Sequence, residues 1–181
     1  MNQQASESRV AVANKQRKVK IDIPRYQAAV AKVLELLGVE DRELSVMFVS
    51  DRKMREMNRQ YRRVDRSTDV ISFPLSKGES AEVMGPLLGD MILSLETIAR
   101  QASEPFEDDR PWTGTFRREL ALMTIHGICH LLGYDHETGE DDAKKMVGKE
   151  RELFGVTWQY FPEMEGEQAP IEAVLPGAWG G

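Results

Sequence analysis

The sequence has very little cysteine and no long apolar run. Cys129 is the single cysteine among 181 residues. One cysteine excludes an intrachain disulfide and is typical of a protein of the reducing cytosol. No apolar stretch approaches the roughly 18 residues of a membrane span, and the apolar run at residues 10–13 is too short for the core of a signal peptide. We therefore expect a cytoplasmic protein with no membrane partner.

An excess of positive charge is also absent, because 24 Lys and Arg stand against 30 Asp and Glu, for a net charge of −6. This balance argues against a surface that binds nucleic acid everywhere, although it allows a local basic patch. The length and composition predict a single domain with its own core. We expect that domain at residues 19–163, between a polar, disordered N-terminal arm at 1–18 and a loose, Pro- and Gly-containing C-terminal tail at 164–181.

Hydrophobic spacing within the domain switches between the strand and helix periods. Period-two or short apolar runs predict strands at residues 19–23, 43–49, 69–73 and 90–95. Helical spacing predicts helices at 24–37, from an Asp51 cap to about residue 61, at 116–132 and at about 143–155. Strands early and helices late predict an α+β fold.

All three histidines fall within eleven residues, in the segment HGICHLLGYDH at 126–136. Helical spacing puts His126 and His130 on one face, about 40° apart around the axis and about 6 Å apart along it. Gly133 falls where a left-handed residue ends a helix, which could return His136 to the same point. Three neutral imidazoles with an open fourth position are typical of a catalytic zinc site. We predict one Zn²⁺ per chain, with nickel, copper and manganese as open alternatives.

The alternative interpretation is that these are three histidines without a shared ligand, placed at a helix end where positive charge is favourable. Cys129 is a further candidate ligand, although a small buried helix residue is the commoner reading. The histidine spacing also matches the metzincin pattern H-E-x-x-H-x-x-G-x-x-H, except that Gly127 replaces the glutamate. Glycine cannot move a proton, so the usual peptidase mechanism lacks its general base.

Residues 51–66 carry seven Arg and Lys against three Asp and Glu, a local positive excess inside an acidic chain. A charged helix is often only a solvated face, and that alternative stays open. Arginine predominates, however, and its planar fork suits phosphate oxygens, while Tyr61 offers a ring for stacking a base. A metal centre combined with such arginines favours phosphodiester over peptide hydrolysis.

Three segments in order, NRQYRRVDRSTDVISFP (58–74), LLGDMILS (87–94) and HGICHLLGYDH, resemble the signature blocks of the YbeY family of bacterial endoribonucleases. The resemblance spans about residues 20–160. It implies a small mixed β-sheet packed with helices and a zincin-like helix that carries the metal. It also implies a metal-dependent endoribonuclease of single-stranded RNA that acts in 16S rRNA 3′-end maturation and ribosome quality control.

The same resemblance implies roles for particular residues and partners. His126, His130 and His136 would hold the zinc, and Arg62, which follows the tyrosine of N-x-x-Y-R, matches the arginine that the family needs for activity. The catalytic candidates are therefore Arg62 and His126, and the RNA-binding candidates are Arg59, Tyr61, Arg62 and Arg63. The implied partners are small-subunit ribosomal RNA and the ribosome, with a small-subunit ribosomal protein and a ribosome-assembly GTPase. Ser67 departs from the family's usual proline, which predicts a looser turn.

Our mechanistic hypothesis is that the metal polarises a water or a phosphate oxygen while Arg62 stabilises the charge that develops on phosphorus. The nucleophile stays open between water and the RNA 2′-OH. Asp135 and Asp90 are candidates for moving protons or orienting ligands, and no general base is assigned. Two other functions stay open: a non-catalytic RNA-binding ribosome-assembly factor with a structural metal, and a metzincin-like metalloprotease.

Overall fold

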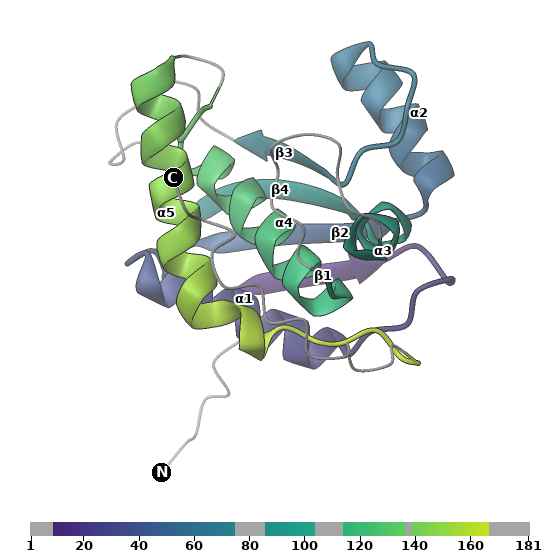
Figure 1. Ribbon diagram of the computed structural model, residues 1–181, viewed down its shortest axis with the longest axis horizontal. Helices are drawn as coiled ribbons and strands as arrows, with labels where there is room; N and C mark the ends of the chain where they lie inside the picture. The colour runs from purple at the N-terminus through teal and green to yellow at the C-terminus, as the bar shows by residue number, and fades with distance from the viewer. Residues whose placement is uncertain (1–8, 75–85, 104–113, 137–138, 167–181) are drawn as a thin grey trace.

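The computed structural model describes residues 9–74, 86–103, 114–136 and 139–166, which form a mixed four-stranded sheet covered by helices (Figure 1). The strand order is β1-β2-β4-β3, with β1, β2 and β4 parallel and β3 antiparallel at one edge. The strands are β1 (Val10–Asn14), β2 (Glu43–Val49), β3 (Val70–Pro74) and β4 (Leu87–Ser94). The helices are α1 (Ile23–Leu36), α2 (Asp51–Arg62), α3 (Leu95–Ser103), α4 (Phe116–Leu131) and α5 (Glu140–Thr157), followed by the 3-10 turn Trp158–Tyr160. The predicted α+β class is confirmed.

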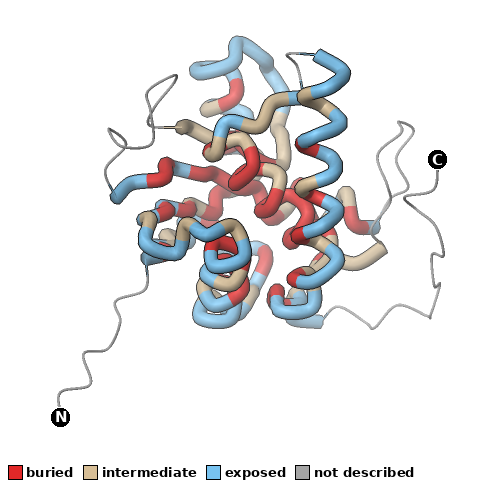
Figure 2. Tube along the Cα trace, turned by 90° about the vertical axis from the view of Figure 1, so that its left-hand side faces the viewer, coloured by how far each residue is buried: buried red, intermediate tan, exposed pale blue. Residues whose placement is uncertain are grey.

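Helices cover both faces of the sheet. Side chains alternate along each strand, so each strand contributes residues to both faces. In β2, Leu44 and Phe48 enter the larger core, which includes residues of α1, α4 and α5. The intervening Met47 contacts a smaller cluster that includes Met54 of α2. Figure 2 shows the buried residues gathered where the helices meet the sheet, with exposed residues on the outer sides. The helix with two of the histidines, α4, and the basic helix, α2, therefore pack on opposite faces.

The predicted strand at 19–23 is wrong. The segment is irregular and pairs with none of the described strands: Val19 is buried and Asp22 is exposed. The Asp22 carboxylate accepts a hydrogen bond from the Arg25 backbone N–H, which begins α1. The first strand is instead β1 (Val10–Asn14), which lies inside the N-terminal arm expected at 1–18. Residues 1–8 lie outside the described part of the chain.

Two further expectations change at the helix ends. Ser50, not Asp51, caps α2, since its hydroxyl accepts from the Lys53 N–H. Helix α3 follows β4 directly and was not expected, because the apolar run of β4 continues into Leu95. The predicted tail also begins too early, because Met164 packs against the core, while residues 167–181 lie outside the described ranges.

In the ranges that the structure describes, we find no helix with the length and apolar character needed to cross a membrane.

Candidate metal centre

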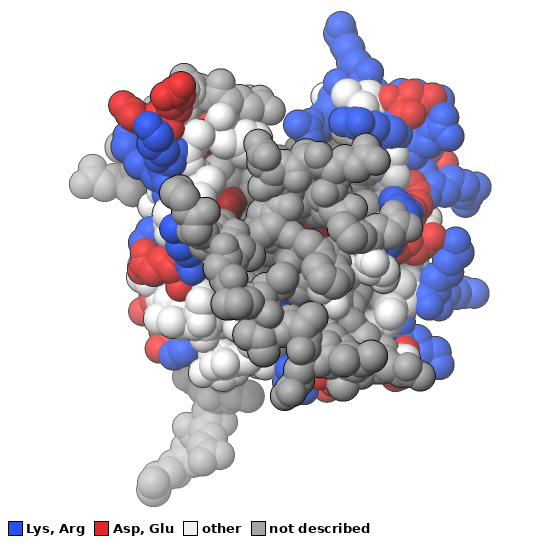
Figure 3. Space-filling model, viewed as in Figure 1, with Lys and Arg blue, Asp and Glu red and all other residues white. Residues whose placement is uncertain are grey.

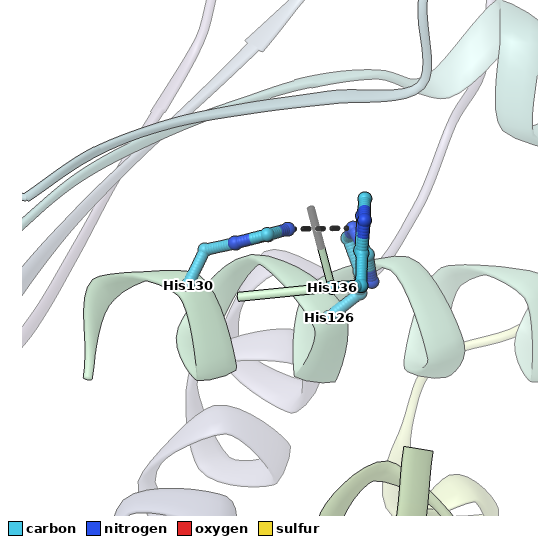
Figure 4. A group of neighbouring side chains, drawn as sticks. All are labelled: His126, His130 and His136. Carbon is cyan, nitrogen blue, oxygen red and sulfur yellow. Dashed lines mark hydrogen bonds between the residues drawn. The ribbon is translucent and has the colours of Figure 1, made fainter. Parts of the chain in front are cut away.

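The three histidines converge, as their spacing predicts (Figure 4). His126 and His130 project from the last turns of α4, and Gly133, with a φ of 88°, turns the chain so that His136 faces them. The Nε2 atoms of His126 and His130 are 3.1 Å apart. One ring nitrogen from each of the three residues lies within 4.8 Å of the others. The fold thus brings three ligand atoms to one point.

This donor set fits a metal ion of the zinc type. Two nitrogens bound to one tetrahedral zinc at about 2.0–2.1 Å lie about 3.3 Å apart, close to the observed His126–His130 separation. Burial lowers the pKa of His130, and the neighbouring His126 and His136 lower it further. A lowered pKa keeps the His130 imidazole neutral at pH 7, and the neutral form is the one that binds metal.

A buried carboxylate, which the motif did not reveal, contacts this centre. The Nδ1 of His126 lies 2.7 Å from Oε1 of Glu150 in α5. Glu150 is 8% exposed and shares a helix face with the buried Met146 and Leu153. A glutamate on an apolar helical face could have indicated a special role for Glu150 from the sequence alone. The sequence could not identify His126 as its partner, because that contact depends on how α5 packs on α4.

Gly127 explains why this centre has no metzincin base. A Cβ at Gly127 would lie 2.3 Å from the Met91 sulfur and 3.1 Å from the Ser72 hydroxyl. The Ser72 hydroxyl also donates a 3.1 Å hydrogen bond to the Gly127 carbonyl. Because α4 lies this close to β3 and β4, a glutamate at position 127 would point into the sheet. The packing therefore argues against the peptidase mechanism.

Cys129 does not take part in the centre. It is fully buried in the core, and its sulfur is not among the converging ligand atoms. Burial raises the pKa of the Cys129 thiol to about 12, so it stays protonated at neutral pH. Asp90 also points elsewhere: its neighbour Met91 packs in the core with α4, so strand alternation turns Asp90 to the other face. Asp135 directly precedes His136 and remains a candidate for moving protons.

The basic segment forms an exposed face of α2 and the loop after it (Figure 3). Lys53 pairs with Glu56, and Arg55 pairs with Asp65. The RNA-binding candidates differ from these two, since none of Arg59, Arg62 and Arg63 makes an ion pair with a described residue. Among the described residues, these three guanidinium groups therefore have no carboxylate partner that would compete with an outside anion.

The fourth RNA-binding candidate, Tyr61, is 55% exposed. It packs edge-on against Phe73 of β3, with ring centroids 5.0 Å apart. The aromatic contact holds the ring in place beside the basic residues. Phe73 faces α2, whereas the preceding Ser72 contacts Gly127 of α4, so the Tyr61 ring and the helix that carries two of the histidines lie on opposite sides of the edge strand β3.

Hydrogen bonds hold both ends of α2. The Asp51 carboxylate accepts from the hydroxyls of Ser94 and Thr97 and from Arg100 of α3. Burial alone would raise the pKa of Asp51, but these bonds, with one from Ser67, lower it to about 2. Instead of loosening the turn, Ser67 ties it to Asp51 at 3.1 Å.

At the other end of α2, the Asn58 side chain donates to the Arg66 carbonyl at 2.8 Å. The Asn58 backbone carbonyl also accepts from the N–H groups of Arg63 and Val64. Asn58 is 3% exposed, so these contacts are shielded from water. They fix the path of the loop that follows Arg62.

The mixed sheet and the glycine turn that returns a third histidine to a core helix define an α+β protein with a three-histidine candidate metal centre. Residues 11–157 match the model of the family described as Endoribonuclease YbeY. This match covers most of the chain, and the chain therefore belongs to the YbeY family.

Individual relatives agree with the family match. The chain is 41% identical over 149 residues to Endoribonuclease YbeY of Geobacter metallireducens, covering 82% of this chain and 95% of that protein. It is 39% identical over 146 residues to Endoribonuclease YbeY of Syntrophotalea carbinolica, covering 80% and 93%. Its fold is similar to the solution structure of TM1509 from Thermotoga maritima, with a TM-score of 0.57, 26% identity, and coverage of 83% of this chain and 89% of that one.

Proposed function

We propose that this protein is a metal-dependent, single-strand-specific endoribonuclease that acts in 16S rRNA 3′-end maturation and ribosome quality control in the cytoplasm. The observation that carries the proposal is the convergence of three histidine nitrogens within 4.8 Å in a chain of the YbeY family. Relatives at about 40% identity bear the name endoribonuclease. Arg59, Arg62 and Arg63, which make no ion pair with a described residue, support an anionic substrate.

The proposed division of labour follows from the two groups of residues. His126, His130 and His136 hold one Zn²⁺ through ring nitrogens. When bound, zinc would supply Lewis acidity, one way of promoting phosphodiester cleavage. Arg62 stabilises the charge that develops on the phosphate oxygens, because its guanidinium can donate two parallel hydrogen bonds.

The remaining candidates bind the rest of the RNA. Arg59 and Arg63 bind neighbouring phosphates, and the exposed Tyr61 ring stacks on an unpaired base. Stacking on one ring needs a base that is free of its pair, which accounts for a preference for single strands. We further propose the ribosome, a small-subunit ribosomal protein and a ribosome-assembly GTPase as partners.

The test is cleavage of an end-labelled single-stranded RNA by zinc-loaded protein. We compare the wild type with Arg62→Ala, and use Arg52→Ala as the matched control, because Arg52 is an exposed arginine in the first turn of the same helix. The expected result is a loss of about 10²-fold or more for Arg62→Ala, typical of removing a transition-state donor, with little change for Arg52→Ala.

Two results would contradict the proposal. Equal cleavage by all three preparations would mean that a contaminating nuclease is at work or that Arg62 is not needed. RNA binding by the zinc-loaded wild type without any cleavage, on ribosomal precursor as well as on short RNA, would favour the non-catalytic assembly factor.

A further inference from the structure

We propose that Glu150 is a positioning residue for the metal centre, which sets the proton location and ring orientation of His126. The inference rests on the metal site of the proposed function, but it does not depend on RNA cleavage. It concerns a residue 24 positions from His126 in the sequence, on a different helix.

The contact is short and shielded. The 2.7 Å separation joins Nδ1 of His126 to Oε1 of Glu150, whose side chain is 10% exposed. Lys149, one of the two cations next to it on α5, is paired with Glu152. Among the residues that the structure describes, His126 is the hydrogen-bond partner of this carboxylate.

This contact decides which ring nitrogen faces the other histidines. An ionised carboxylate can only accept hydrogen bonds, so the proton of a neutral His126 resides on Nδ1. Its Nε2 then carries the free lone pair, and this is the atom that lies 3.1 Å from Nε2 of His130. Glu150 thus presents the correct nitrogen of His126 to a metal and prevents the ring from turning over.

The burial of Glu150 supports the same assignment. A buried carboxylate is unfavourable unless it is hydrogen-bonded and its charge is balanced. The centre offers three neutral ligands, so a divalent cation held there would be balanced in part by Glu150. On a helix face where Met146 and Leu153 are both buried, a glutamate has no comparable role in packing.

The experiment measures zinc affinity by competition with a chromophoric chelator, without RNA. The variants are Glu150→Ala, Glu150→Gln and the control Glu152→Ala, which removes an exposed glutamate from the same helix. We expect a 10- to 100-fold loss of affinity in Glu150→Ala, the usual effect of removing such a partner. We expect a smaller loss in Glu150→Gln, which keeps an acceptor but loses the charge, and none in Glu152→Ala.

A second readout is the tautomer of His126 in metal-free protein, from ¹⁵N NMR of the ring nitrogens. The wild type should carry the proton on Nδ1. Glu150→Ala and Glu150→Gln should both show a mixture, because the glutamine amide can donate to Nδ1 as well as accept from it. If Glu150→Ala does not fold, the wild-type tautomer and the isosteric Glu150→Gln carry the test. A wild-type proton on Nε2, or wild-type zinc affinity in every folded Glu150 variant, would overturn the proposal. Absence of RNA cleavage would contradict the proposed function alone.

Discussion

At the scale of single residues, Gly127 governs what can surround the metal centre. We predict that Gly127→Ala lowers the free energy of unfolding by about 1–3 kcal/mol, the usual cost of overpacking a core. The added Cβ would meet the Met91 sulfur at 2.3 Å, and Met91 is itself fully buried. Urea denaturation followed by circular dichroism measures the change.

Gly148→Ala in α5 is the matched control, because nothing lies within 4 Å of the Cβ it would add. There the substitution should stabilise the protein by about 0.5–1 kcal/mol, through the better helix propensity of alanine. Equal effects at the two glycines would show that Gly127 is not held against the sheet.

The sequence predicts the histidines and Gly133 well but not Glu150. Helix geometry alone fixes the relation of His126 to His130, and a glycine after the last turn indicates where the chain reverses. The Glu150 contact joins two helices across 24 residues. Its formation depends on the packing of α5 on α4, which local spacing does not encode.

At the scale of elements, the end of α2 holds Arg63 in the left-handed region, with a φ of 59°. That conformation costs a non-glycine residue about 1 kcal/mol or more. We predict that Arg63→Gly keeps or raises stability, by up to about 1 kcal/mol, and weakens the binding of single-stranded RNA. Thermal unfolding and fluorescence anisotropy of a labelled RNA measure the two effects.

Arg63→Asn provides the control, because asparagine tolerates the left-handed region but carries no charge. It should lose RNA affinity to the same extent as Arg63→Gly. Wild-type affinity in both variants would mean that Arg63 faces solvent without binding RNA.

The junction between α2 and α3 predicts a defined response to acid. The pKa of Asp51 is about 2 in the folded protein and has an ordinary value of 3.8. The lowered pKa stabilises the fold fully above pH 3.8, and this contribution is lost as the pH falls through 2. After allowance for partial exposure, it amounts to about 1–2 kcal/mol.

We therefore predict that Asp51→Asn destabilises the protein at pH 7 and that the difference from the wild type narrows toward pH 2. Urea denaturation at a series of pH values measures this difference. A difference that stays constant from pH 7 to pH 2 would mean that the negative charge of Asp51 does not stabilise the junction.

Helices and strands could be predicted where the hydrophobic pattern of a single segment was enough to identify them. The spacing in α1, α4 and α5 and the apolar runs of β2 and β4 indicated these elements directly. The alternation at 19–23 misled because it reflects contact with the core rather than strand pairing. Strand β1 is a short edge strand, and its pairing with β2 is a tertiary contact that the polar flanks conceal.

At the scale of the whole molecule, β3 connects the two halves of the proposed site. Ser72 contacts the carbonyl of Gly127 in α4, whereas the next residue, Phe73, contacts Tyr61 of α2 on the opposite face. Successive side chains of a strand point to opposite faces, so one short edge strand supports both the metal centre and the basic face. The net charge of the whole chain is −6, whereas residues 51–66 carry an excess of positive charge. A polyanion would therefore be attracted to this segment rather than to the surface as a whole.

The central claim is that the three-histidine centre makes RNA cleavage depend on metal. The most direct measurement is the rate of cleavage of single-stranded RNA as zinc is titrated into metal-free protein, alongside folded His130→Ala treated identically. We predict that the wild-type rate rises in proportion to bound zinc up to one ion per chain, and that the variant stays inactive. Full activity of the metal-free wild type, or wild-type cleavage by His130→Ala, would contradict the account.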